Sequence, residues 1–265
     1  MTRFCTFASG SSGNAALLSC GSTHLLIDMG ISCRRICRAL ADQGLTPQDL
    51  SAVLITHEHT DHISGLATYI KKYPTPILCT PGTARQLQYR LAGIGLLLRP
   101  LPMGETAEWG EATITPLPTS HDCRESAAFR VDTPDGAVGY LTDTGLIEEE
   151  TRQGLLGAQL LVLESNHDVD MLLSGPYPYH LKRRVLGSEG HLSNADAARF
   201  AAESAQAGTQ AIILAHLSAE NNTPRLALDT VGEQLALAGY AGQLTVAPRC
   251  EAGKVHVLEG VPCRR

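Results

Sequence analysis

The chain has 265 residues, 43% of them hydrophobic and 18% charged, which suits one large globular domain or two closely packed halves. Its net charge of −6 argues against nucleic-acid binding through an overall basic surface, so any such role must depend on local positive charge, of which bound cations are one source. The chain shows no signal peptide, its apolar runs are too short to cross a bilayer and its eight cysteines are scattered, which together predict reduced thiols, a cytoplasmic location and no membrane contact.

The first ninety residues predict strands that alternate with helices. Short apolar runs separated by Ser/Gly loops indicate the strands, and apolar positions at helical spacing indicate the helices. The expected strands cover residues 4–8, 15–19, 24–28, 51–56 and 76–79, and the expected helices cover 32–43, 63–72 and 83–91.

The remainder of the chain is richer in strands. Helices are expected over 148–156, 194–206 and 224–237, and strands over 106–109, 112–117, 127–131, 138–141, 160–163 and 211–214 and near Leu244 and Val255. Many internal strands with helices between them predict sheets packed together with helices on the outside. No stretch reads as a linker, so residues 1–265 are expected to form a single domain.

The most informative stretch is His57-Glu58-His59-Thr60-Asp61-His62, which follows the apolar run 52–55. His57, His59, Asp61 and His62 are potential metal ligands, because imidazole and carboxylate suit cations such as Zn²⁺ or Mn²⁺ that must keep a bound water. A regular helix would point ligands at these spacings in different directions. We therefore expect a tight loop at the end of a strand, and a surface loop that is merely rich in His is the weaker interpretation.

Three further candidate ligands follow predicted strands, namely His121, Asp143 and His216. Functional groups gather just past buried strands in α/β architectures. Taken singly, each residue is more often a cap, turn or surface residue. Together with the loop they supply seven ligands, enough for two metal ions that share a water if Asp143 bridges them.

With these residues in place, the sequence resembles the metallo-β-lactamase fold. The resemblance implies an α/β (α+β) protein built as an αββα sandwich, in which two mixed β-sheets are flanked by helices and a two-metal site lies at one edge. By that resemblance, His57, His59 and His121 hold one metal, Asp61, His62 and His216 hold the second, and Asp143 bridges them. The metals would be two divalent ions, Zn²⁺ or Mn²⁺, with Fe²⁺ also compatible.

Further segments resemble YycJ/WalJ-like proteins, which are bacterial cytoplasmic phosphodiesterases with reported DNA exonuclease activity. The matching segments are SGSSGN (9–14), LID (26–28), ESNHD (164–168), GPYPY (175–179), GHLSN (190–194) and HLSAENN (216–222). Glu164 and His191 also occupy the places of a Glu–His pair in tRNase Z, although Leu192 departs from the Gly-His-Ser-Thr turn found there.

The resemblance implies phosphodiester hydrolysis by a hydroxide shared between the two metals. Asp61 would orient or deprotonate the nucleophile, and His191 would protonate the leaving oxygen while Glu164 fixes its tautomer. The simpler interpretation of His191 is a residue that merely precedes the helix cap Ser193.

Substrate contacts are expected from several polar segments. The Gly/Ser loop that contains Ser11, Ser12 and Asn14 could cradle a phosphate, or it could be an ordinary turn. His167 could contact a metal or a phosphate, or make a local turn bond. The aromatic and basic segment 177–184 has a composition that favours single-stranded nucleic acid, or it begins a solvated helix with packed tyrosines. The expected contacts are Ser11, Ser12, Asn14, His167, Lys182, Arg183 and Asn221.

The favoured function is therefore a DNA exonuclease acting on single strands or duplex ends. The alternative is a hydrolase of a small ester, thioester, lactone or cyclic phosphodiester, and a non-catalytic metal protein is the third possibility. Glu164 comes 21 residues after Asp143, too few for a long tRNA-binding arm. His216 comes 73 residues after Asp143, too few for a β-CASP insertion, so RNA is the less expected substrate. The native metal, the polarity of digestion and the oligomeric state stay open.

Overall fold

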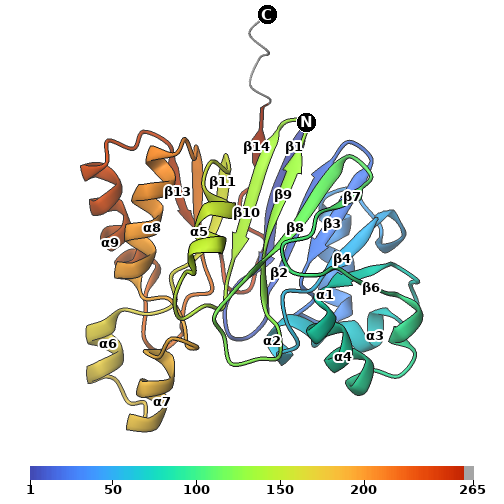
Figure 1. Cartoon of the computed structure of the whole chain (residues 1–265), viewed down its shortest axis with the longest axis horizontal. Helices are drawn as coiled ribbons and strands as arrows, with labels where there is room; N and C mark the ends of the chain where they lie inside the picture. The colour runs from blue at the N-terminus through green and yellow to red at the C-terminus, as the bar shows by residue number, and fades with distance from the viewer. Residues whose placement is uncertain (260–265) are drawn as a thin grey trace, which may run out of the picture.

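The computed structural model describes residues 1–259 as two seven-stranded sheets packed face to face with helices on both outer faces (Figure 1). This arrangement confirms the expected αββα sandwich. No helix among the described residues is long and apolar enough to cross a membrane.

The first sheet is formed by the N-terminal half of the chain and by the last strand. Its β1–β2–β3 meander is antiparallel, β14 pairs antiparallel with β1, and the strands from β3 to β6 are parallel. In spatial order its strands are β14 (His256–Leu258), β1 (Thr2–Ala8), β2 (Ala15–Cys20), β3 (Thr23–Ile27), β4 (Ala52–Leu54), β5 (Ile77–Cys79) and β6 (Leu98–Pro100).

The second sheet repeats this plan. The strands from β7 to β10 pair antiparallel, and the strands from β10 to β13 pair parallel. In spatial order its strands are β13 (Gln243–Val246), β12 (Ala211–Ala215), β11 (Leu160–Glu164), β10 (Gly136–Leu141), β9 (Ala127–Thr133), β8 (Ala112–Pro118) and β7 (Ala107–Trp109).

Three apolar clusters hold the layers together. The central cluster joins the facing sides of the two sheets through residues such as Phe4, Leu18, Phe129 and Val162. A second cluster packs α1 (Cys33–Asp42), α3 (Leu66–Tyr69) and α4 (Pro81–Arg90) on the first sheet, and a third packs α5 (Glu149–Leu155), α8 (Asn194–Gln206) and α9 (Pro224–Leu237) on the second. The remaining helices are the 3₁₀ turns η1 (Pro47–Asp49) and η2 (Ile94–Leu96) and the short α2 (Thr60–Ile63), α6 (Val169–Ser174) and α7 (Tyr179–Val185).

The expected helix over 63–72 is wrong as a single element, because it divides into α2 and α3. Gly65 lies between them, with its backbone N–H donating to Met29 O at 2.9 Å. A Cβ on Gly65 would lie 2.2 Å from Ile31 O, so the chain passes too close to the 29–31 loop for a regular helix to continue. Sequence patterns also missed β6 and α6.

Gly30 makes the tightest approach to the segment after β4. A Cβ at this position would lie 1.6 Å from Asp61 O, because Gly30 N and Asn14 N both take part in the backbone bonds that fix this region. We expect Gly30→Ala to lower the free energy of unfolding by roughly 3 kcal/mol, as overpacking against backbone does. Urea denaturation measures this change.

Gly232→Ala is the matched control. This glycine lies within α9, and its added Cβ would meet only Leu244 Cδ2, at 3.7 Å. We expect this change to leave stability unaltered or to raise it by about 1 kcal/mol, the difference between Gly and Ala in a helix. Equal stability of the two variants would refute the importance of the Gly30 contact.

Candidate metal centre

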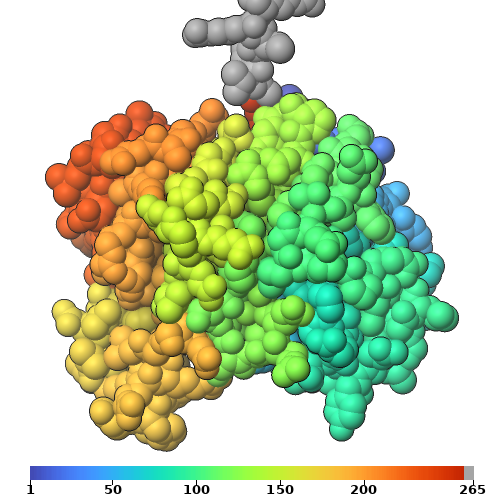
Figure 2. Space-filling view, viewed as in Figure 1, coloured from blue at the N-terminus to red at the C-terminus, as the bar shows by residue number. Residues whose placement is uncertain are grey.

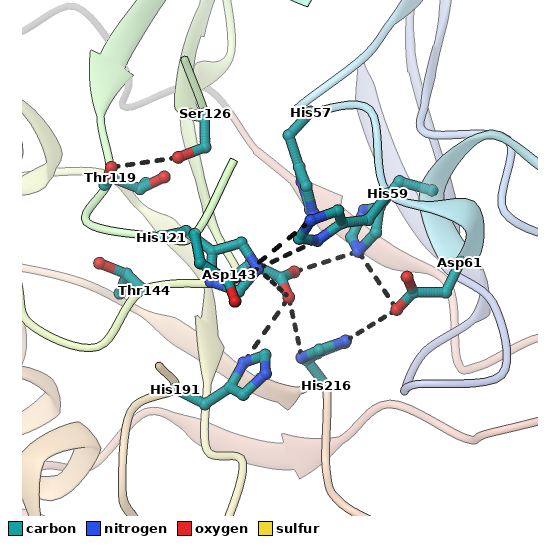
Figure 3. Close-up of polar contacts among 12 residues, drawn as sticks. His57, His59, Asp61, Thr119, His121, Ser126, Asp143, Thr144, His191 and His216 are labelled. Atoms are coloured by element: carbon teal, nitrogen blue, oxygen red, sulfur yellow. Dashed lines mark hydrogen bonds and ion pairs between the residues drawn. The ribbon is translucent and has the colours of Figure 1, made fainter. Parts of the chain in front are cut away.

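The seven predicted ligands meet at one edge of the sandwich, where strands of both sheets end (Figure 3). The segment after β4 supplies His57 and His59, and α2 supplies Asp61 and His62, so half of the expected loop is a helical turn. The other three follow strands of the second sheet: His121 follows β8, Asp143 follows β10 and His216 follows β12.

The ligand atoms form two neighbouring triads. His57, His59 and His121 present atoms within 4.8 Å of one another, and Asp61, His62 and His216 do the same. Asp143 lies between them, with Oδ2 3.1 Å from His62 Nε2 and Oδ1 3.7 Å from His121 Nε2. The seven side chains therefore lie in the grouping that the resemblance implied, and their binding of metal stays a prediction.

One buried atom in this cluster, His57 Nε2, lacks a hydrogen-bond partner among the described residues. An unsatisfied buried polar atom costs about 1–3 kcal/mol, so native proteins seldom keep one without a reason. Imidazole nitrogens and carboxylate oxygens gathered at these distances are the donor set of Zn²⁺ and similar cations. The residues present therefore fit divalent metal binding.

Asp28 orients the ligands on the first sheet, and it is a residue that the sequence analysis did not select. Its Oδ2 accepts from His62 Nδ1 at 2.7 Å, and its Oδ1 accepts from Thr56 N at 2.9 Å. Thr56 Oγ1 in turn lies 3.0 Å from His57 Nδ1. Because the Nδ1 atoms are engaged, the Nε2 atoms of both imidazoles are left for a metal. The segment Leu26-Ile27-Asp28, at the end of a buried strand, was the available signal.

Glu164 has the corresponding role on the second sheet. Its Oε1 accepts from His191 Nδ1 at 2.8 Å and from His216 Nδ1 at 2.9 Å. Its Oε2 accepts from the backbone N–H groups of Thr144 at 2.9 Å and Leu192 at 3.3 Å. One buried carboxylate thus holds a predicted ligand and the predicted proton donor at once, whereas the sequence had paired it with His191 alone.

The cluster perturbs the protonation of its own members. Burial opposes ionisation of Glu164, but the neighbouring His191 and His216 lower its pKa to about 2. Burial likewise opposes charge on His216, yet Asp143, Asp61 and Glu164 raise its pKa to about 10. For His57, burial and the nearby His62 hold the pKa well below its usual range, so this imidazole is neutral and can act as a ligand.

Three non-glycine residues among those described have positive φ, and all three belong to this edge: Asp28 at 60°, Asp143 at 58° and His216 at 55°. The left-handed conformation costs a residue with a side chain about 1–2 kcal/mol. Strain of this kind concentrates at functional sites. Here it turns each side chain back toward the cluster immediately after its strand ends.

A cavity of about 260 Å³ opens beside the ligands, between them and α7. His121 and His191 line it, together with the predicted contact residues Ser11 and Asn221. Tyr177, Arg184 and Glu189 form part of its outer wall.

The other predicted contact residues lie elsewhere. Ser12 is exposed outside the cavity lining, and Arg183 is exposed on α7. Lys182 is half-buried, with its Nζ donating to Leu173 O at 2.6 Å. Asn14 and His167 are buried and do not line the cavity, so they have no open surface for a direct substrate contact. Asn14 instead bonds within its own loop and lies 3.1 Å from His62 Nε2 through Nδ2.

Residues 23–217 match the family described as "Beta-lactamase superfamily domain", and the chain belongs to this family. The fold also matches the metallo-β-lactamase-fold protein YhfI from Bacillus subtilis, with a TM-score of 0.72 and 19% identity over 97% of this chain and 100% of that one. The protein is therefore a hydrolase of the metallo-β-lactamase fold.

Its relatives are nucleases by name. The chain is 36% identical over 239 residues to "Exodeoxyribonuclease WalJ" of Streptococcus pneumoniae, covering 89% of each chain. It is 33% identical over 238 residues to "Exodeoxyribonuclease YycJ" of Bacillus anthracis, covering 89% of this chain and 90% of the relative. A "Ribonuclease Z" of Streptomyces coelicolor matches at 27% identity, covering 88% of this chain and 89% of that protein.

Asp28→Ala tests the orientation of the ligands without removing a ligand. We expect metal affinity to fall by about 10- to 100-fold, the usual effect of losing a carboxylate that holds a ligating imidazole. Competition with a chromogenic chelator measures the affinity. Asp49→Ala, which removes a carboxylate from the η1 capping box, is the control and should retain full affinity. Unchanged affinity of the Asp28 variant would contradict this role.

Proposed function

We propose that the protein is an exonuclease that hydrolyses phosphodiester bonds at DNA ends with two bound divalent cations. The observation that carries this proposal is the His191–Glu164 pair beside the two ligand triads. His191 Nδ1 is held by Glu164 at 2.8 Å, and the ring lines the cavity next to the ligands. A site that only hydrolysed a small activated ester would have less need of a separate proton donor.

His57, His59 and His121 would hold one cation, Asp61, His62 and His216 would hold the other, and Asp143 would reach both. When bound, such cations, Zn²⁺ or Mn²⁺ by the chemistry of the donors, lower the pKa of a water and neutralise charge on a phosphodiester. The protein groups keep the donors in place through Asp28 and Glu164.

Two side chains of the protein then accept and donate the protons of the reaction. Asp61 is the least buried of the carboxylates in the cluster, with 24% of its side chain exposed, and it can accept the proton of the attacking water. Burial opposes protonation of His191, but the Glu164 and Asp143 carboxylates raise its pKa, which favours the charged form that a proton donor needs. With Nδ1 bonded to Glu164, its Nε2 can donate to the departing sugar oxygen.

DNA is proposed as the substrate because the relatives at 33–36% identity are named exodeoxyribonucleases. RNA is less supported, since the chain between Asp143 and Glu164 has room only for α5 and the start of β11. We also propose that residues 1–265 form one domain without a β-CASP insertion. The terminal nucleotides would be contacted by residues that line the cavity, namely Ser11, Asn221 and Arg184, and by the nearby Lys182 and Arg183.

His191→Ala tests the proton donor. We expect kcat on DNA to fall by about 10²- to 10⁴-fold, the usual contribution of general acid catalysis, while bound metal stays at the wild-type level. Elemental analysis and steady-state kinetics on the same preparation measure both quantities. Loss of metal with unchanged turnover per metallated enzyme would show that His191 is structural.

The choice of substrate needs a direct assay. Metal-free protein is reconstituted with Zn²⁺, Mn²⁺ or Fe²⁺ and offered end-labelled single- and double-stranded DNA and RNA, beside a thioester and a lactone. We expect the stepwise release of mononucleotides from DNA with at least one metal and none after chelation. Hydrolysis of the thioester or lactone without cleavage of any nucleic acid would replace the proposal by the small-molecule alternative.

A further inference from the structure

The acidic chain contains a long segment without any carboxylate. Residues 62–104 include no Asp or Glu and hold five cations, Lys71, Lys72, Arg85, Arg90 and Arg99. All five are exposed, and none forms an ion pair within residues 1–259. In a protein of net charge −6, these unpaired cations give the segment a local excess of positive charge, which the proposed function has not used.

This surface is attached directly to the metal centre through α4. At the C-terminal end of the helix, Arg90 Nη1 donates to Glu58 O at 2.7 Å, and Glu58 lies between two ligands, His57 and His59. At the N-terminal end, Thr80 Oγ1 donates to Glu125 O at 2.6 Å and Gly82 N donates to the Glu125 carboxylate. Both ends of α4 are therefore fixed to segments that carry or adjoin ligands.

The solvent face of α4 combines positive charge with an aromatic ring. Ala84 and Leu87 pack inward, whereas Arg85 and Tyr89 lie four residues apart on the outer face. Tyr89 is 90% exposed, an uncommon position for a large ring that contributes nothing to the core. An exposed aromatic ring beside cations is the combination on which bases of single-stranded nucleic acid stack.

A second basic surface lies across the centre on α7. Arg184 pairs with Asp122 at 2.5 Å, and Asp122 directly follows the ligand His121. Arg183 lies over the ring of Tyr179, 6.0 Å from its centroid. Figures 1 and 2 show α4 and the α6–α7 pair as two projections from the same end of the molecule, on opposite sides of a recess. The 260 Å³ cavity lies on the α7 side and is too small for more than about one nucleotide.

We propose that the outer face of α4 binds the single-stranded part of the nucleic-acid substrate that leads to the terminal nucleotide in the cavity beside α7. This inference rests on the proposed function for its choice of ligand. Tyr89 stacks on a base, and Arg85 contacts the backbone phosphates. The strand thus crosses the metal centre from α4 to α7, which places one scissile bond next to the ligands.

The test measures binding separately from cleavage. Arg85→Ala/Tyr89→Ala is compared with Arg225→Ala/Leu237→Ala, which removes an exposed arginine and an exposed apolar side chain from α9, both outside the cavity lining. Each pair is made in the His191→Ala background, which slows cutting of the probe during the measurement. Fluorescence anisotropy follows a labelled single-stranded DNA of about 20 nucleotides at several salt concentrations.

We expect Arg85→Ala/Tyr89→Ala (the α4 pair of substitutions) to raise Kd about tenfold, as loss of a stacking ring does. The slope of log Kd against log salt should fall by about 0.7, because one phosphate contact is lost. The α9 pair should change neither quantity. Tyr89→Phe keeps the ring and should bind like the parent protein. A loss that Phe also shows would point to the hydroxyl or to folding, and the melting temperatures distinguish these outcomes.

Unchanged Kd and salt slope for the α4 pair, or equal losses in the α9 pair, would overturn the inference. These outcomes are independent of the proposed function, which fails only if active wild-type enzyme cleaves no DNA. A protein that binds DNA through α4 but never cuts it would support this surface and refute the exonuclease. If Arg85→Ala/Tyr89→Ala leaves DNA cleavage unchanged, the exonuclease is supported and the α4 surface is refuted.

Discussion

The structure depends on the burial of imidazole and carboxylate groups at the edge between two sheets. An ionised group moved out of water is costly unless opposite charge, hydrogen bonds or a metal compensate for the loss of hydration. Here Asp143, His62 and His216 are almost wholly buried, and Asp143 lies within ion-pair distance of both histidines. The strands, the tight glycine contacts and the strained residues nearby all keep this cluster compact enough for cations to complete it.

The two sheets hold their buried carboxylates at this edge by the same arrangement of strands. Asp28 follows β3 and Asp143 follows β10, and each of these strands has an antiparallel neighbour on one side and a parallel one on the other. In α/β sheets, functional groups gather just past the carboxyl ends of the strands, which is where both residues lie. Both residues have φ near +60°, which turns the carboxylate back across the end of its own strand. The ends of the neighbouring strands β4 and β11 then supply Thr56 and Glu164, which complete the support.

The fold and the grouping of the candidate ligand side chains could be predicted from sequence because their signals are local. A buried strand reads as an apolar run, and four metal-binding side chains within six residues directly indicate a metal site. The predicted boundaries of helices and strands were wrong where packing against distant segments overrides the hydrophobic periodicity of the sequence. The expected helix over 63–72 breaks at Gly65, which is in contact with the distant segment 29–31, and β6 is a three-residue edge strand with too little pattern to detect.

The sequence by itself determined the donor set, since residue type and order along the chain fix which atoms can bind a cation. Only the tertiary structure decided that Asp28 holds His62 and that one Glu164 oxygen serves both His191 and His216. It also decided that Asn14 and His167 face inward and that Tyr89 of α4 stands exposed near the metal segment. These relations join residues up to 52 positions apart, so they exist only once the sheets pair and bring strand ends together.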